Sequence, residues 1–131
     1  MDKFLDFKIK NHKALNKKIL FVEYLEEEFS TDTETTRKIV EHYVEEIKKH
    51  PKLIVIIDIR NIKSFDKKSV WEGSGILKEY DHFFVEHITK AFLITESQTA
   101  NTLINIILKV MKNSIPTILV KDIKEALGNL N

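Results

Sequence analysis

Cysteine is absent from the sequence, and so is any marked excess of one charge. Without cysteine, disulfide bonds, zinc sites built from thiolates and thiol nucleophiles are excluded. The 21 basic and 20 acidic residues give a formal net charge of +1. Non-specific nucleic-acid binding needs a basic excess, because cationic side chains displace the counterions of the phosphates. This balance of charge therefore argues against nucleic acid as a partner.

Long hydrophobic segments are also lacking. The longest apolar run, LIVII at 53–57, is far shorter than the roughly 20 residues that a membrane span needs. The N-terminal stretch MDKFLDFKIKNHK lacks the apolar centre of a signal peptide. The chain has 131 residues, of which 43% are hydrophobic, which is enough for a real core. We therefore expect one domain over residues 1–131, soluble and cytoplasmic, without a membrane span.

Alternation and short apolar runs predict the strands. Residues 4–9 and 18–26 alternate as half-buried strands do, and the polar residues between them predict a hairpin. Residues 52–59, 88–95 and 115–120 are short, continuous apolar runs rich in β-branched residues. Such runs are typical of strands that are covered on both faces of a sheet.

Helical spacing of apolar residues fills the gaps between these strands. Thr31 or Asp32 is expected to cap a helix that ends before Pro51, and Asp66 a helix that runs to about residue 80. Gly73 and Gly75 are expected to bend or break the second helix. Residues 96–113 and the final 11 residues predict two more helices.

The order of elements is therefore β-β-α-β-α-β-α-β-α. Strands that alternate with helices predict right-handed crossovers. The expected fold class is α/β, with a largely parallel central sheet of about five strands. The N-terminal hairpin adds an antiparallel edge, and about four helices flank the sheet.

The stretch VIIDIRNIKSFDKKSV, residues 55–70, contains the candidate site residues. Asp58 lies in an apolar strand, where a carboxylate must be paired or hydrogen-bonded. Arg60, two residues further on, is its expected partner. A catalytic carboxylate would need a second carboxylate or a histidine beside it. We therefore interpret Asp58 as a structural carboxylate and predict no catalytic residue.

Lysines after the predicted cap are the best sign of a binding site. Lys67 and Lys68 fall in the first turn of the helix that Asp66 caps, where the positive helix end disfavours cations. A helix start that carries two lysines is also an arrangement that binds anions. Residues Asp66, Lys67, Lys68 and Ser69 are therefore the predicted partner- or anion-binding site.

The element order and residues 55–70 together resemble the STAS domain family, named after sulphate transporters and anti-anti-sigma factors. Its members often have a strand ending Leu-Asp-Leu, a short loop, and Asp-Ser-Ser-Gly at a helix start. IDIRNIKSFDKKSV follows that pattern without a gap, with Asp58 on the first Asp and Asp66 on the second. The resemblance covers roughly residues 19–131 and includes uncharacterised bacterial STAS-like proteins.

The departure from the family pattern concerns its regulation. In the regulatory members, a partner kinase phosphorylates the first Ser of Asp-Ser-Ser-Gly. That position is Lys67 here, the second Ser is Lys68 and the Gly is Ser69, while Ser64 is off register. A lysine cannot accept the phosphoryl group in that chemistry, so the switch that depends on about −2 of added charge is lost. The resemblance thus implies a non-enzymatic, regulatory interaction module without this control.

Two kinds of partner remain open. The module would present residues 62–72 to an unidentified protein, and the edge strand at 4–9 makes a homodimer the alternative. A small-ligand carrier or sensor is the other function, by analogy with related α/β folds, for a lipid, a nucleotide or another anion. A large apolar cavity under the helices at 66–80 and 97–112 would favour the lipid.

The remaining polar and aromatic residues predict no further site. His82 and Glu86 share a helix face but His87 does not, so we predict no metal. No motif indicates a cofactor. The aromatic residues, Trp71 among them, are interpreted as core. Joint exposure of Phe83 and Phe84 would instead indicate a partner surface.

Overall fold

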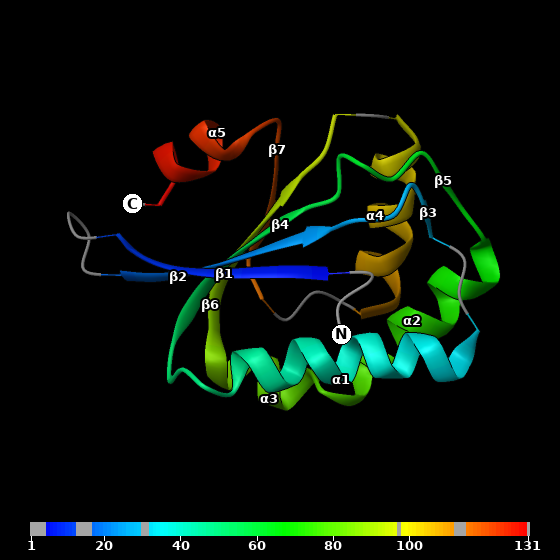
Figure 1. Cartoon of the computed structure of the whole chain (residues 1–131), viewed down its shortest axis with the longest axis horizontal. Coiled ribbons are helices and arrows are strands. Elements are labelled where there is room, and N and C mark those ends of the chain that lie inside the picture. Colours follow the sequence, from blue (N-terminus) through cyan, green and yellow to red (C-terminus); the bar gives the residue numbers. More distant parts are fainter. Residues whose placement is uncertain (1–4, 13–16, 30–31, 97, 112–114, 131) are drawn as a thin grey trace.

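A five-stranded sheet forms the centre of the molecule (Figure 1). The computed structural model describes residues 5–12, 17–29, 32–96, 98–111 and 115–130. The strands are β1 (Leu5–His12), β2 (Lys17–Tyr24), β4 (Leu53–Asp58), β6 (Ile88–Ile94) and β7 (Thr117–Val120). They lie in the order β1-β2-β4-β6-β7. Only the β1–β2 pair of this sheet is antiparallel. The predicted α/β class, with its N-terminal hairpin, is confirmed.

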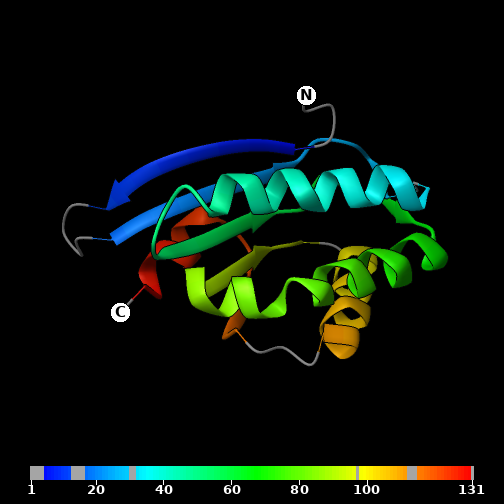
Figure 2. The same cartoon turned by 90° about the horizontal axis from the view of Figure 1, so that it is seen from below.

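Helices connect the parallel strands. They are α1 (Thr33–Ile47), α2 (Lys67–Glu79), α3 (Asp81–His87), α4 (Gln98–Met111) and α5 (Ile123–Gly128). Each crossover, by α1, by α2 with α3, or by α4, steps to the neighbouring strand in the same direction. Right-handed crossovers that all step one way place their helices on one face of the sheet. Figures 1 and 2 show α1 to α4 on that face and α5 on the other.

Strand β4 is buried on both faces, as its unbroken apolar run predicts. Leu53 and Val55 belong to the core between the sheet and helices α1 to α4. Ile54 and Ile56 belong to a second core on the face that α5 covers. Alternate residues of a strand point to opposite faces, so one short segment contributes to both cores.

A second, two-stranded sheet holds the chain just before α2. Strand β3 (Glu28–Phe29) pairs in parallel with β5 (Ser64–Phe65). The amide of Lys63 donates to the carbonyl oxygen of Glu27 over 2.7 Å, and the amide of Asp66 donates to that of Phe29 over 2.9 Å. This small sheet fixes where α2 begins, and the sequence pattern did not predict it.

A bulge at the start of β6 changes which side chains face the helices. Leu53 pairs with Ile88 but the next residue, Ile54, pairs with Lys90, so Thr89 is the extra residue. An extra residue reverses the alternation of the side chains. Ile88 consequently belongs to the core beneath the helices, while Phe92 belongs to the core on the opposite face.

Helix α2 runs through both of its central glycines, so the expected break does not occur there. The chain turns instead at Tyr80, where α2 ends and α3 follows. A Cβ atom on Gly73 would lie 3.2 Å from Cγ2 of Thr36 on α1. Gly73 therefore allows α1 and α2 to pack closely, and this close approach explains the glycine.

Candidate functional site

Asp66 caps α2 as the sequence predicts. Its Oδ2 accepts a hydrogen bond from the backbone amide of Ser69 and another from the Ser69 hydroxyl, each over 3.0 Å. A carboxylate at this position also balances the positive end of the helix. An external anion at the helix start would have to compete with the carboxylate of Asp66. The cap therefore favours a partner-binding interpretation of this helix start over an anion site.

Three exposed side chains lie together on the first two turns of α2. Lys67 and Lys68 are exposed, and Trp71 follows them at spacings of four and three residues, which places all three on one side of the helix. Trp71 is 65% exposed. The amino group of Lys68 lies 3.9 Å from a carboxylate oxygen of Glu72. We call Lys67, Lys68 and Trp71 the α2 surface.

The interpretation of Trp71 as a core residue was wrong. Phe84 and Phe92 are buried as expected, but Trp71 is among the exposed large hydrophobic residues. The buried residues of α2 include Val70, Gly73 and Ser74. Helical periodicity from Val70 and Leu77 already assigns the core stripe to positions 70, 73–74 and 77, so it could have shown that position 71 points away from the core.

Ser69 does not belong to this surface. It is 4% exposed and its hydroxyl donates to Asp66. Among the residues of the predicted binding site, Lys67 and Lys68 are accessible side chains, whereas Ser69 is part of the cap. Ser64, in β5, is exposed.

Asp58 pairs with Arg60 at the end of β4. Arg60 donates through Nη2 to Oδ2 over 2.8 Å and through Nε to Oδ1 over 3.0 Å. The Arg60 backbone amide donates to the same Oδ1 over 3.0 Å. The side-chain hydrogen bonds to Asp58 raise the pKa of the Arg60 guanidinium. Asp58 thus holds the turn that follows β4, which is what a structural carboxylate does.

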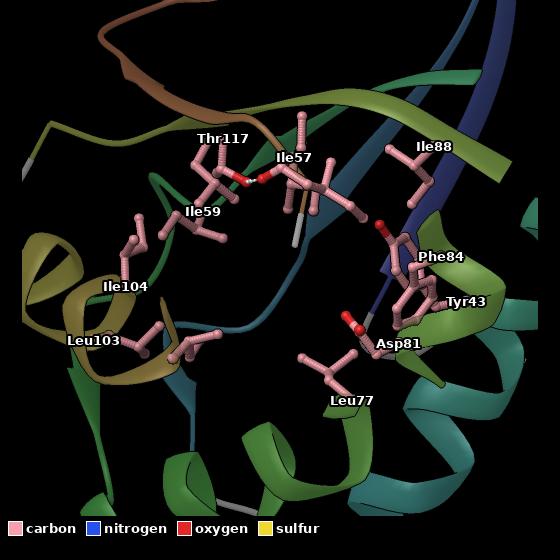
Figure 3. A pocket seen from close by; sticks show the side chains of 14 residues that line it. Tyr43, Ile57, Ile59, Leu77, Asp81, Phe84, Ile88, Leu103, Ile104 and Thr117 are labelled. Atoms are coloured by element: carbon pink, nitrogen blue, oxygen red, sulfur yellow. Dashed lines mark hydrogen bonds between the residues drawn. The ribbon is translucent and has the colours of Figure 1, made fainter. Parts of the chain in front are cut away.

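An apolar cavity lies between the sheet and its helices (Figure 3). Its volume is about 200 Å³. Helices α1 to α4 and strands β4, β6 and β7 all contribute to its wall. The residues that line it are Tyr43, Ile57, Ile59, Leu77, Asp81, Phe84, Ile88, Ala91, Leu93, Leu103, Ile104, Ile107, Ile115 and Thr117. The cavity lies beneath α2 and α4, the two helices under which a lipid would require one.

A second apolar pocket of about 160 Å³ adjoins the first. The two share six lining residues: Tyr43, Ile57, Ile59, Leu77, Leu103 and Ile107. The inward side of α2 contributes Val70, Gly73, Ser74 and Leu77 to this second pocket. Burial raises the pKa of Tyr43, which lines both pockets.

The histidines of α3 have structural contacts. His87 stacks on Phe83 with ring centroids 4.3 Å apart, and its Nδ1 lies 2.8 Å from the carbonyl oxygen of His50. Within the part of the chain that the structure describes, no three His, Asp or Glu residues converge as a metal site requires. Phe84 is 2% exposed, so Phe83 and Phe84 do not form an exposed pair. Neither Asp58 nor His82 lines either of the two pockets.

The sequence matches a family model described as a domain of unknown function, DUF7793, over residues 14–131. The chain belongs to the DUF7793 family. No curated protein matches this DUF7793 chain. Among the solved structures similar to it is an uncharacterized protein of the DUF3478 family from Shewanella loihica PV-4, described as having a SpoIIAA-like fold.

The similarity to that structure shows the fold of the DUF7793 chain. The similarity covers 100% of this chain and 99% of the other, with a TM-score of 0.61 and 15% sequence identity. SpoIIAA-like proteins have the STAS fold, so the STAS-like architecture expected from the order of the elements and residues 55–70 is confirmed. At this identity the likeness concerns the fold alone.

Among the helices of the DUF7793 chain that the structure describes, none is both long enough and apolar enough to cross a bilayer.

Proposed function

We propose that this DUF7793 chain is a non-enzymatic, STAS-like interaction module that binds a protein partner through the α2 surface. The observation that supports this most is the exposure of Trp71 beside two lysines. Tryptophan is enriched among the residues that contribute most to protein–protein binding, and so large an apolar side chain gains much by being covered. Lys67 and Lys68 add positive charge, which favours an acidic partner.

The position of this surface in the fold also supports the proposal. Lys67 and Lys68 occupy the positions where regulatory STAS proteins carry the phosphorylated Ser and its neighbour. In those members, another protein must recognise this helix start. The same helix start is accessible in this chain, where it carries a permanent positive charge. Binding would then be constitutive, without control by phosphorylation. Asp58 and Asp66 act structurally, by holding the turn and the helix start behind this surface.

A pull-down with matched charge variants tests the proposal. The tagged chain is incubated with lysate of its source, and retained proteins are compared between wild type, Lys67→Glu with Lys68→Glu, and Trp71→Ala. Lys121→Glu with Lys124→Glu is the matched control, because it makes the same change of charge at exposed positions by α5 on the other face of the sheet.

The expected result is one acidic protein that the wild type and the α5 control retain and that both α2-surface variants lose. The protein has only one tryptophan, so its fluorescence emission should shift to the blue when the purified partner covers Trp71. Equal retention by all variants, or an unchanged emission in the complex, would rule out this surface.

A second candidate function is the binding of a small apolar ligand. The two adjoining apolar pockets beneath α2 and α4 favour it, because protein interiors are otherwise close-packed and contain few voids larger than a water molecule. Native mass spectrometry of the protein purified without denaturation tests this candidate. A mass excess that disappears on denaturation is expected, and purification only as the apo-protein would count against it.

A further inference from the structure

Strand β1 forms one edge of the central sheet. It stands first in the strand order, so among the described strands of this sheet its one neighbour is β2. Figure 2 shows β1 along the outer side of the molecule. An edge strand presents a row of backbone amides and carbonyls with which a strand of another chain can pair.

The two edges of the sheet differ in how well they resist such pairing. Strand β7, at the other edge, has four residues and begins directly after Pro116. Strand β1 has eight residues, contains no proline and pairs with β2 without a bulge. Short strands, prolines and bulges are common means by which proteins block an edge. The edge that can accept a further strand is therefore β1.

The register with β2 assigns each residue of β1 to one face of the sheet. The odd-numbered residues are in register with buried residues of the core beneath the helices, and these pairs are Leu5 with Tyr24, Phe7 with Val22, and Ile9 with Leu20. Asp6 and Lys8 are assigned to the opposite face, because alternate residues of a strand point to opposite faces.

Carboxylates follow one another across three strands on that opposite face. Asp6 is in register with Glu23 of β2, and Glu23 is in register with Asp58 of β4. Asp58 is paired with Arg60, as described above. Like charges directly opposite each other on neighbouring strands are destabilising. A cation on the outer side of Asp6 would therefore stabilise this part of the sheet.

The sequence of β1 supplies that cation when two copies of the strand pair antiparallel about a twofold axis. With the axis at Phe7, the opposite positions are Phe7 with Phe7, Asp6 with Lys8, and Leu5 with Ile9. Apolar residues then face apolar residues, and each aspartate faces a lysine. An axis at Asp6 or at Lys8 would set a like charge against itself. An axis at Ile9 would set Lys8 against Lys10.

We infer that the protein forms a homodimer in which the β1 strands of two copies pair antiparallel about Phe7. The two five-stranded sheets then join into one continuous sheet, and Asp6 of each copy faces Lys8 of the other. No residue of the α2 surface takes part, so the dimer presents two such surfaces and binds a partner with two matching sites through avidity. The dimer does not depend on whether the α2 surface has a partner.

Sedimentation velocity over a series of protein concentrations tests the dimer through an exchange of charges. The wild type is expected to pass from monomer to dimer as the concentration rises. Asp6→Lys sets lysines against each other at both symmetry-related pairs, so the dissociation constant of the dimer should rise at least about tenfold. The double variant Asp6→Lys with Lys8→Asp restores opposite charges in both pairs and should dimerise as the wild type does.

The same substitution distinguishes a lost dimer from a weakened fold. Asp6→Lys replaces the like-charge pair with Glu23 inside one copy by an opposite-charge pair, so the free energy of unfolding of the monomer should not fall. Lys124→Glu is the control, because it reverses a charge at an exposed position of α5. Its dissociation constant should equal that of the wild type.

Engineered cysteines test the register, because the chain has none of its own. Opposite positions of antiparallel strands have Cβ atoms about 4.5–5.5 Å apart, close to what a disulfide needs. Phe7→Cys should therefore give a disulfide-linked dimer under mild oxidation. A mixture of Asp6→Cys and Lys8→Cys proteins should crosslink faster than either variant alone. This mixture serves if circular dichroism shows that Phe7→Cys does not fold, and Leu119→Cys on β7 is the control for the other edge.

The outcomes separate the dimer from its details. A monomer at every concentration would overturn the inference. Equal dimerisation of the wild type and Asp6→Lys, or a double variant that stays monomeric, would overturn the contact between Asp6 and Lys8. Faster crosslinking of Leu119→Cys than of the β1 variants would overturn the assignment of the interface to β1.

Discussion

The two sides of helix α2 differ strongly in their exposure to solvent. The outward side presents the α2 surface, with a large aromatic ring exposed to solvent. The inward side consists of small and aliphatic residues that lie over an apolar pocket. Adjacent residues in the chain, Val70 and Trp71, are 1% and 65% exposed.

This difference shows why hydrophobicity alone does not identify a site. Trp71 is apolar but accessible, and a partner could cover it. The inward residues are apolar and buried, yet they leave space that a ligand could fill. One helix thus serves both candidate functions, the protein-binding one on its outward side and the ligand-binding one on its inward side.

The largest effect is expected from placing the same new residue on either side of α2. Val70→Asp puts an unpaired carboxylate into the core, which should lower the free energy of unfolding by about 3–5 kcal/mol. Trp71→Asp changes an exposed position and should stay within about 0.5 kcal/mol of the wild type. Urea unfolding followed by circular dichroism measures both, and similar losses in the two variants would disprove the assignment of the two sides.

A smaller effect on the free energy of unfolding is expected at alkaline pH. Its size depends on how well the inward side of α2 is shielded from water. Burial raises the pKa of Tyr24 from 10.0 to about 12, with a further contribution from Glu26, and burial also raises the pKa of Tyr43. The folded protein then keeps phenolic protons that the unfolded chain loses. Stability from these groups is complete below pH 10 and should fall as the pH rises from there through the raised values.

The ultraviolet absorbance of tyrosinate, followed together with unfolding, measures this effect. Tyr24→Phe and Tyr43→Phe should each reduce the loss of stability at alkaline pH, because phenylalanine has no proton to lose. If either tyrosine ionised at its ordinary pKa while the protein remained folded, the inward side would be wetter than the structure indicates.

The smallest effect is expected from the lysines of the α2 surface. Lys67→Glu puts a favourable charge at the positive helix end and should raise the free energy of unfolding by about 0.3–1 kcal/mol at low salt. Lys68→Glu should be closer to neutral, because it replaces the attraction to Glu72, 3.9 Å away, with repulsion. Thermal unfolding in low and high salt distinguishes the two, and a Lys67→Glu variant less stable than the wild type would contradict this account.

Features that depend on neighbours along the chain followed from the sequence. Asp66 caps α2 by accepting from Ser69, three positions away, and Asp58 pairs with Arg60, two positions away. The apolar run of β4 implied burial on both faces, and the alternation of strands and helices implied the parallel sheet. In each case the interacting groups are brought together by local geometry, which the spacing of residues specifies.

Features that depend on segments far apart in the chain could not be predicted from the sequence. Pairing of β3 with β5 joins residues 36 positions apart, such as Glu28 and Ser64. The bulge at Thr89 exists only in relation to β4. The packing of Gly73 against Thr36 depends on two helices. Spacing along one segment contains no information about which surface of another segment it will meet.

Local propensity and hydrophobic period are enough to predict the α/β class, the caps and the candidate helix start at residues 66–68. The exposure of Trp71, the burial of Ser69 and the apolar cavity beneath α2 and α4 appear only once the chain is folded. A cavity is volume left unfilled by side chains from seven elements, so its size depends on how those elements pack together and on no single stretch of the chain.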